Sequence, residues 1–189
     1  MIKKFRTYWI LIIVLGLACN DIEAQKSLKI IDKKINFGYR EIPDRKIDVI
    51  IIHSVFNNSG GEKYDIDLII KQFRRYRVSS HYIIGRNGSI YQLVADKNVA
   101  SHAGKSCLPD GRTGVNRCSL GIEIVTSYTE SPTEEQTNAL LDLVNQLNTQ
   151  YKIKYILRHS DIATERKSDP WNFDWIAFNN RLLTSTLQT

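Results

Sequence analysis

The sequence predicts a single α/β domain in which a mixed central β-sheet is flanked by helices. β-branched apolar runs alternate along the chain with segments whose apolar residues recur at helical spacing, which is typical of a sheet with helices packed on its faces. One Asn-Gly pair between two short apolar runs adds a hairpin. The 189 residues suffice for one domain with its own core, and their composition is that of an ordinary globular protein.

Residues 1–24 predict a signal peptide and not a part of the fold. MIKKFR is a short basic start, and TYWILIIVLGLA is an uncharged apolar run that is too short to span a bilayer comfortably. An uncleaved membrane anchor is the alternative. Leu17-Ala18-Cys19 resembles a lipoprotein cleavage box with Cys19 as the lipidated residue, and cleavage after Ala24 is its rival. We therefore expect export to a bacterial envelope, as a periplasmic or lipid-anchored protein, or secretion.

Processing of this segment changes the charge of the chain. Its basic residues Lys3, Lys4 and Arg6 are accompanied by no acid up to residue 18, so their removal lowers the formal net charge from +6 to +3. The remaining charge is modest, and there are no stripes of alternating aromatic and basic residues. Both observations argue against a nucleic-acid partner.

The first half of the expected domain, which spans 45–189, contains a strand, a helix and a hairpin. Before it, the polar residues 25–44 predict an extended arm. IDVIIIHS at 47–54 is a continuous β-branched run, typical of a strand buried on both faces. YDIDLIIKQFRRYR at 64–77 has apolar residues at helical spacing, with Asp early and Arg late, as the helix dipole favours. HYIIGRNGSIYQL predicts a hairpin with Asn-Gly in its turn.

The second half adds two strands and two helices. SLGIEIVTSY at 119–128 and KYILRH at 154–159 predict the strands. A long amphipathic helix follows the first of them, with Ser131 as N-cap and Glu134 at N3 in a capping box. NFDWIAFNNRLL at 172–183 predicts a closing helix.

Cys107 and Cys118 flank a polar loop, CLPDGRTGVNRC. In an exported chain such a pair predicts a disulfide, worth roughly 2–3 kcal/mol from the entropy of loop closure. Two metal ligands are the weaker alternative, because the spacing is long and no histidine lies between the cysteines.

The stretch RHSDIATERKSDPW is polar and rich in chemically active side chains. His159 in this stretch and His53 both lie at the carboxyl end of a predicted strand, where ligands gather in such sheets. Either histidine alone is equally well explained as a hydrogen-bonded core residue. Together with Asp169 they form a ligand set suited to zinc, with a fourth position left for water. Pro170 favours extended backbone before it, so Lys167 can face the same side as Asp169; a solvated polar turn is the alternative.

Glu123 lies inside the apolar run SLGIEIV. If this strand faces a cleft, burial raises the pKa of the carboxyl group into the range useful for a general base. A salt-bridged glutamate on an edge strand is the alternative.

The motifs VIIIHS, VSSHYIIGRNGSIYQLV, ASHAGKS, CSLGIEIV and RHSDIATERKSDP occur in this order. From about residue 45 to 175 the chain resembles the zinc-dependent N-acetylmuramoyl-L-alanine amidases of the type 2 amidase family, which includes phage lysozyme-amidases, anhydro-muropeptide amidases and peptidoglycan recognition proteins. The resemblance implies a zinc enzyme that hydrolyses the amide bond between N-acetylmuramic acid and L-alanine in peptidoglycan or muropeptides. A non-catalytic peptidoglycan-binding protein of the same fold is the alternative, and a different hydrolase or nuclease is a more remote one. We expect a monomer.

The resemblance also assigns roles to individual residues. It implies that His53, His159 and Asp169 bind Zn²⁺ and that Lys167 lies near the metal, where it stabilises the oxyanion. Glu123 matches the strand glutamate that acts as catalytic base in the anhydro-muropeptide branch.

Two further histidines are placed near the substrate by the resemblance. His102 matches a histidine that lines the substrate groove, and His81 lies in the hairpin beside the site, where a packing role is the alternative. Ser101 stands where the family often has tryptophan, and Ser80 stands where phage and animal relatives often have tyrosine. The second departure favours a mechanism through Glu123 over one assisted by tyrosine.

Overall fold

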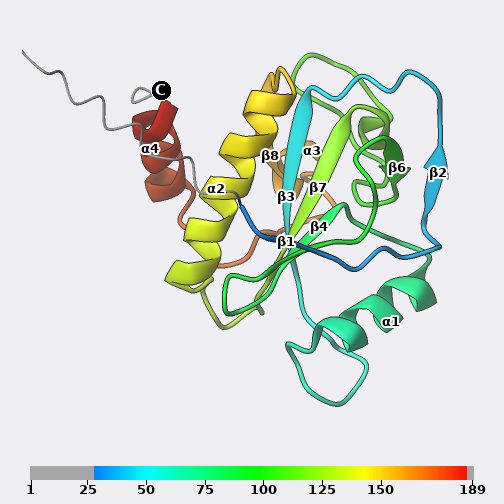
Figure 1. Ribbon diagram of the computed structural model, residues 1–189, viewed down its shortest axis with the longest axis vertical. Helices are drawn as coiled ribbons and strands as arrows, with labels where there is room; N and C mark the ends of the chain where they lie inside the picture. Colours follow the sequence, from blue (N-terminus) through cyan, green and yellow to red (C-terminus); the bar gives the residue numbers. More distant parts are fainter. Residues whose placement is uncertain (1–27, 187–189) are drawn as a thin grey trace, which may run out of the picture.

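The computed structural model describes residues 28–186 (Figure 1). The expected signal peptide and the expected lipidation at Cys19 lie outside these residues. Within the described range, the helices are too short or too polar to cross a bilayer.

A six-stranded sheet forms the centre of the protein, in the order β1-β5-β4-β7-β3-β8. The strands β4, β7, β3 and β8 are parallel, β5 is antiparallel to β4, and β1 is parallel to β5. The predicted mixed sheet and the Asn-Gly hairpin are therefore confirmed. The bounds are β1 Ile30–Asp32, β3 Val49–Val55, β4 Tyr82–Ile84, β5 Ile90–Gln92, β7 Ser119–Val125 and β8 Tyr155–Arg158.

Helices cover both faces of this sheet (Figure 1). On one face, α2 (Glu134–Gln150) and α4 (Trp175–Thr186) enclose the largest apolar cluster, to which β3 contributes Ile50 and Ile52. On the opposite face, α1 (Ile66–Tyr76) covers a second cluster. A third, smaller cluster contains Ile51 of β3. All seven residues of β3 are buried, because apolar side chains from both faces surround this strand.

The expected N-terminal arm is extended and pairs with the rest of the domain. Its first strand, β1, lies against β5, and β2 (Tyr39–Glu41) pairs antiparallel with β6 (Asn98–Ala100) in a separate two-stranded sheet. Hydrogen bonds of the backbone therefore join this segment to the hairpin and to the irregular region that follows it.

The predicted N-terminus of the long helix is wrong by two residues. Thr133 is the N-cap: its side chain accepts from the backbone N–H of Gln136 at 3.1 Å, and the Gln136 side chain accepts from the N–H of Thr133 at 3.0 Å. The buried Gln136 amide also donates to the carbonyl oxygens of Ile84 and Val125. These tertiary bonds to the sheet favour Thr133 over Ser131, which has equally good local capping chemistry.

The predicted disulfide is also wrong, since Cys107 and Cys118 are both free cysteines. The loop between them is held by ion pairs instead: Arg112 contacts Asp48 at 2.9 Å and Asp110 at 3.1 Å. A cross-link is therefore not required to close this loop.

Candidate metal centre

His53, His159 and Asp169 converge on one buried point. The two Nδ1 atoms of the histidines are 3.0 Å apart, and Asp169 Oδ2 lies 3.1 Å from His159 Nδ1 and 3.4 Å from His53 Nδ1. One ligand atom from each of the three side chains lies within 4.8 Å of the other two. The structure thus brings together the three residues that the sequence predicted as a cluster.

The topology of the sheet explains this convergence. β3 and β8 are parallel neighbours in which Ile52 pairs with Arg158, so His53 and the residue after β8 lie side by side. That residue, His159, begins the short helix α3 (His159–Ile162). The backbone N–H of Ser160 donates to the carbonyl oxygen of Asp169 at 2.9 Å. This hydrogen bond holds Asp169, at the end of the polar loop, next to His159.

The electrostatics favour the metal-binding forms of His53 and Asp169. Burial lowers the pKa of His53 to about 4 despite the opposing effect of Asp169, so this imidazole is neutral at pH 7. Burial raises the pKa of Asp169, but the close contacts of its carboxylate with the His159 and His53 rings outweigh burial and hold this pKa well below its usual range. A carboxylate and a neutral imidazole are the forms that bind a divalent cation.

Glu123 lies beside this cluster on the central strand β7. It is the register partner of His53, and its side chain is buried. Burial, followed by the negative charge of Asp169, raises the pKa of Glu123 to about 8, while Lys167 opposes the shift. The alternative of a salt-bridged glutamate on an edge strand is wrong, because β7 lies between β4 and β3.

Lys167 is exposed to solvent and stands two residues before the buried Asp169. Its positive charge lowers the pKa of both His53 and Glu123, so the ammonium group lies within electrostatic range of each. The loop therefore presents Asp169 inward and Lys167 toward the solvent side of the same site.

His102 lies behind His53, and His81 lies deeper still. His102 Nδ1 is 3.0 Å from His53 Nε2, and the two rings meet edge to face. His81 has no exposed surface; its Nδ1 accepts from the backbone N–H of Gly121, and its Nε2 lies 3.0 Å from the carbonyl oxygen of Asn98. These contacts fit the packing alternative for His81.

Gly121 is a residue of the site that the sequence analysis did not single out. It lies on the same face of β7 as Glu123, and a Cβ atom there would be 2.6 Å from Cγ of His102. The absence of a side chain therefore makes room for the His102 ring. The signal available in the sequence was a glycine inside an apolar strand, which often marks such a close approach.

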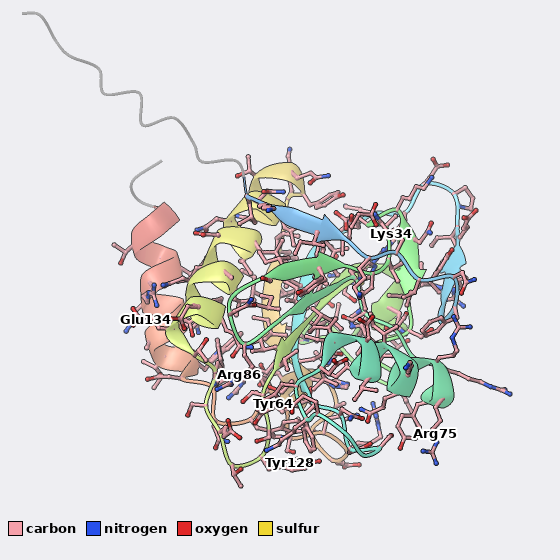
Figure 2. The ribbon with its side chains drawn as sticks, turned by 60° about the horizontal axis from the view of Figure 1, so that its bottom comes forward. Lys34, Tyr64, Arg75, Arg86, Tyr128 and Glu134 are labelled. Atoms are coloured by element: carbon pink, nitrogen blue, oxygen red, sulfur yellow. The ribbon has the colours of Figure 1, made fainter. Side chains whose placement is uncertain are left out.

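An aromatic cluster at the carboxyl end of β3 and β7 was also missed. Phe56, Tyr128 and Trp171 contact one another, with the ring centroids of Tyr128 and Trp171 4.3 Å apart. Tyr128 is 64% exposed and lies at the lower side of the molecule in Figure 2. The three residues are distant in sequence, so only the folded chain shows them as a group.

Taken together, the fold and the site define an α/β protein with a buried His-His-Asp cluster and an adjacent high-pKa glutamate at one end of its sheet. Residues 43–172 match the model of the family described as N-acetylmuramoyl-L-alanine amidase, and the chain belongs to this family.

Curated relatives agree with this assignment. The chain is 40% identical over 105 residues to the 1,6-anhydro-N-acetylmuramyl-L-alanine amidase AmpD of Citrobacter freundii, which covers 54% of this chain and 56% of that protein. It is 32% identical over 143 residues to the N-acetylmuramoyl-L-alanine amidase AmiD of Escherichia coli, covering 66% of this chain and 49% of that protein. The chain thus spans about half the length of the curated relatives it matches.

Solved structures confirm the fold. A crystal structure of an AmpD derivative matches with a TM-score of 0.66 and 29% identity, over 78% of this chain and 92% of that one. AmiD from E. coli, in complex with the substrate anhydro-N-acetylmuramic acid-L-Ala-D-gamma-Glu-L-Lys, matches with a TM-score of 0.61 and 30% identity, over 75% of this chain and 60% of that one.

Proposed function

We propose that this protein hydrolyses the amide bond between N-acetylmuramic acid and L-alanine in peptidoglycan or muropeptides, with zinc bound by His53, His159 and Asp169. The observation that carries the proposal is the buried convergence of these three side chains within a member of the amidase family. The relative AmiD, crystallised with an anhydro-muropeptide substrate, supports this class of substrate.

The donor set fits zinc. Two imidazole nitrogens and one carboxylate oxygen are a common set of protein ligands at catalytic zinc sites, where a fourth position stays open. The described residues offer these three groups in one place, with His53 neutral and Asp169 ionised at pH 7. When bound, zinc supplies Lewis-acid chemistry: it polarises the scissile carbonyl group and acidifies water.

Glu123 acts as the general base and then as the general acid. Its buried carboxyl group is already next to His53, and a cation in the adjacent site favours the ionised carboxylate form. The carboxylate takes a proton from the attacking water as the new C–O bond forms. It then delivers this proton to the amine of L-alanine as the C–N bond breaks.

Lys167 stabilises the negative charge that develops on the carbonyl oxygen. Its side chain is exposed to solvent, and its ammonium group is within electrostatic range of His53 and Glu123. The interaction of this ammonium group with the carbonyl oxygen becomes stronger as the oxygen gains negative charge. It therefore stabilises the transition state more than the bound substrate and lowers the activation barrier.

The proposal includes export of the protein to the cell envelope. It is supported by the basic start and the apolar run of residues 1–24, which lie outside the described residues. Lipidation at Cys19 and cleavage after Ala24 are the two routes, and mass spectrometry of the mature protein distinguishes them by the N-terminal residue and the added lipid mass.

The test is mass spectrometry of purified peptidoglycan digested with the protein, with the protein plus chelator, and with an Asp169→Ala variant. We expect peptides with a free L-alanine N-terminus only in the first digest. Binding to peptidoglycan without release of such peptides would instead support the non-catalytic alternative. The complete ligand set and the buried Glu123 favour hydrolysis over that alternative.

A further inference from the structure

We infer that residues 102 and 103 form an outer support that orients both histidine ligands, and that His102 is a positioning residue for His53 and not a contact for the substrate. This inference rests on the zinc site of the proposed function. Three observations support it: the hydrogen-bonded chain that runs from His53 through His102, the contact of His159 with the carbonyl oxygen of Ala103, and the hydrogen bonds that hold residues 102 and 103 in place.

The hydrogen-bonded chain begins at His53. The Nδ1 atom of His53 faces the ligand cluster, and its Nε2 atom lies 3.0 Å from His102 Nδ1. On the other side of the His102 ring, Nε2 lies 3.1 Å from the Ser119 hydroxyl oxygen. This hydroxyl oxygen is 2.7 Å from the carbonyl oxygen of Val115. The last group can only accept, so the Ser119 hydroxyl donates to it and accepts from His102 Nε2–H. His102 Nδ1 then carries a lone pair and accepts from His53 Nε2–H.

This direction determines the tautomer of the ligand. A His53 imidazole whose proton is on Nε2 has its lone pair on Nδ1, which is the atom facing His159 and Asp169. The opposite tautomer would place a proton in the site and leave two lone pairs facing each other between His53 and His102. The chain therefore holds His53 in the form that binds a metal, as outer partners of histidine ligands commonly do.

The next residue performs the same task for the other histidine. His159 Nε2 is 3.3 Å from the carbonyl oxygen of Ala103, which accepts its proton and leaves Nδ1 free to face the site. Two consecutive residues thus receive the outer N–H groups of both imidazoles, one through a side chain and the other through the backbone.

The segment itself is fixed by Asn116. The Oδ1 atom of Asn116 accepts from the backbone N–H groups of His102 at 3.2 Å and Ala103 at 2.8 Å. Arg45, which is partly buried, donates to the carbonyl oxygens of Asn116 at 3.3 Å and Arg117 at 3.1 Å, and it also contacts that of Ser119. The Arg45 guanidinium group therefore connects the segment that holds residues 102 and 103 to the start of β7, because it binds several backbone carbonyl oxygens at once.

The experiment compares two nearly isosteric variants, His102→Asn and His102→Leu, by competition for zinc against a chromophoric chelator. The Asn side chain keeps an acceptor near the position of Nδ1, and Leu does not. We expect His102→Leu to bind zinc roughly 10- to 100-fold more weakly than the wild type, and His102→Asn to recover part of this loss. A second pair tests the same support if a His102 variant does not fold. Asn116→Asp keeps the side-chain oxygen that binds the N–H groups of residues 102 and 103, and Asn116→Leu removes it.

Kinetics at saturating zinc separate the positioning role from a substrate contact. If His102 positions the ligand, the variants have nearly unchanged KM and their loss lies in zinc affinity and kcat. Unchanged zinc affinity in both Leu variants together with a raised KM for His102→Leu would overturn the inference. Failure of the wild type to bind zinc would instead refute the proposed function, so the two failures are distinguishable.

Discussion

Glu123 and His53 are register partners on the adjacent parallel strands β7 and β3, so both side chains leave the same face of the sheet side by side. One of these residues is a ligand candidate and the other is a proton-transfer candidate. Their spacing is therefore determined by the hydrogen-bonded backbone of two strands that are buried along their whole length, and not by a loop.

Replacement of Glu123 by Gln removes the proton acceptor with little change in shape. We expect kcat to fall by roughly 10²- to 10⁴-fold, the usual contribution of general acid–base catalysis. Zinc affinity should remain close to that of the wild type, because Glu123 is not one of the three converging side chains. Steady-state kinetics on a muropeptide, together with the chelator competition, checks both. Turnover close to the wild-type rate would exclude Glu123 as the base.

The metal-free protein should show a pH dependence of stability that comes from Glu123. Its folded pKa is raised to about 8 from 4.5, so between these values the unfolded state loses the proton while the folded state keeps it. The free energy of unfolding of the wild type, relative to Glu123→Gln, should therefore fall as pH rises from about 4.5 to 8 and level off above that. Urea denaturation in excess chelator at several pH values measures this. A difference that is constant or rises over this range contradicts the assignment.

Lys167→Ala should reduce kcat by roughly 10²- to 10³-fold, as the loss of an oxyanion donor does. The side chain is exposed, so the thermal midpoint should change little. Lys167→Arg is the matched control that keeps the charge and should retain part of the activity. If Lys167→Ala and the wild type turn over at the same rate, the oxyanion role is wrong.

Zinc should stabilise the folded protein through the three converging ligands. At a free concentration of 100 Kd we expect about 2.7 kcal/mol of added stability, since the folded chain binds the ion and the unfolded chain binds it less well. Asp169→Ala should abolish most of this gain, whereas Asp174→Ala, which changes an exposed acid of the next segment, should not. Thermal unfolding with and without zinc gives the comparison. Equal zinc-induced shifts in both variants would place the ion elsewhere.

Gly121→Ala should destabilise the protein by about 1–3 kcal/mol, the usual cost of inserting a methyl group into a packed region. The added Cβ would lie 2.6 Å from His102, which must then move away from His53. Gly85→Ala is the control outside the site, because the tightest contact of its Cβ would be with the side-chain oxygen of Asn87 at 3.3 Å, which a small shift of this side chain relieves. Zinc affinity should fall for Gly121→Ala alone, and an unperturbed affinity would show that the His102 ring adapts without disturbing its neighbour.

Several parts of this protein follow from local sequence patterns. The continuous β-branched run predicted the buried strand that holds His53, and the Asn-Gly pair predicted the hairpin of β4 and β5. These elements are predictable because a strand buried on both faces and a tight turn each demand particular residue types within a few positions. The residue types in the polar stretch RHSDIATERKSDPW likewise indicated His159 and Asp169 as ligand candidates.

Other features depended on contacts between segments that are distant in sequence. Thr133 begins α2 because Gln136 reaches the carbonyl groups of two strands, and no local signal separates it from Ser131. The loop between Cys107 and Cys118 is closed by ion pairs that include an acid far away in the chain.

The sequence by itself determined the order of the longer strands and helices and the candidates for the chemically active side chains, because secondary structure and ligand chemistry are properties of short segments; it did not predict the short elements β6 and α3. Only the tertiary structure decided that His102 and Ala103 stand behind the two histidine ligands, and that Glu123 pairs with His53 on a central strand. The physical reason is that hydrogen-bond direction and strand register arise between elements, at the point where packing brings them together.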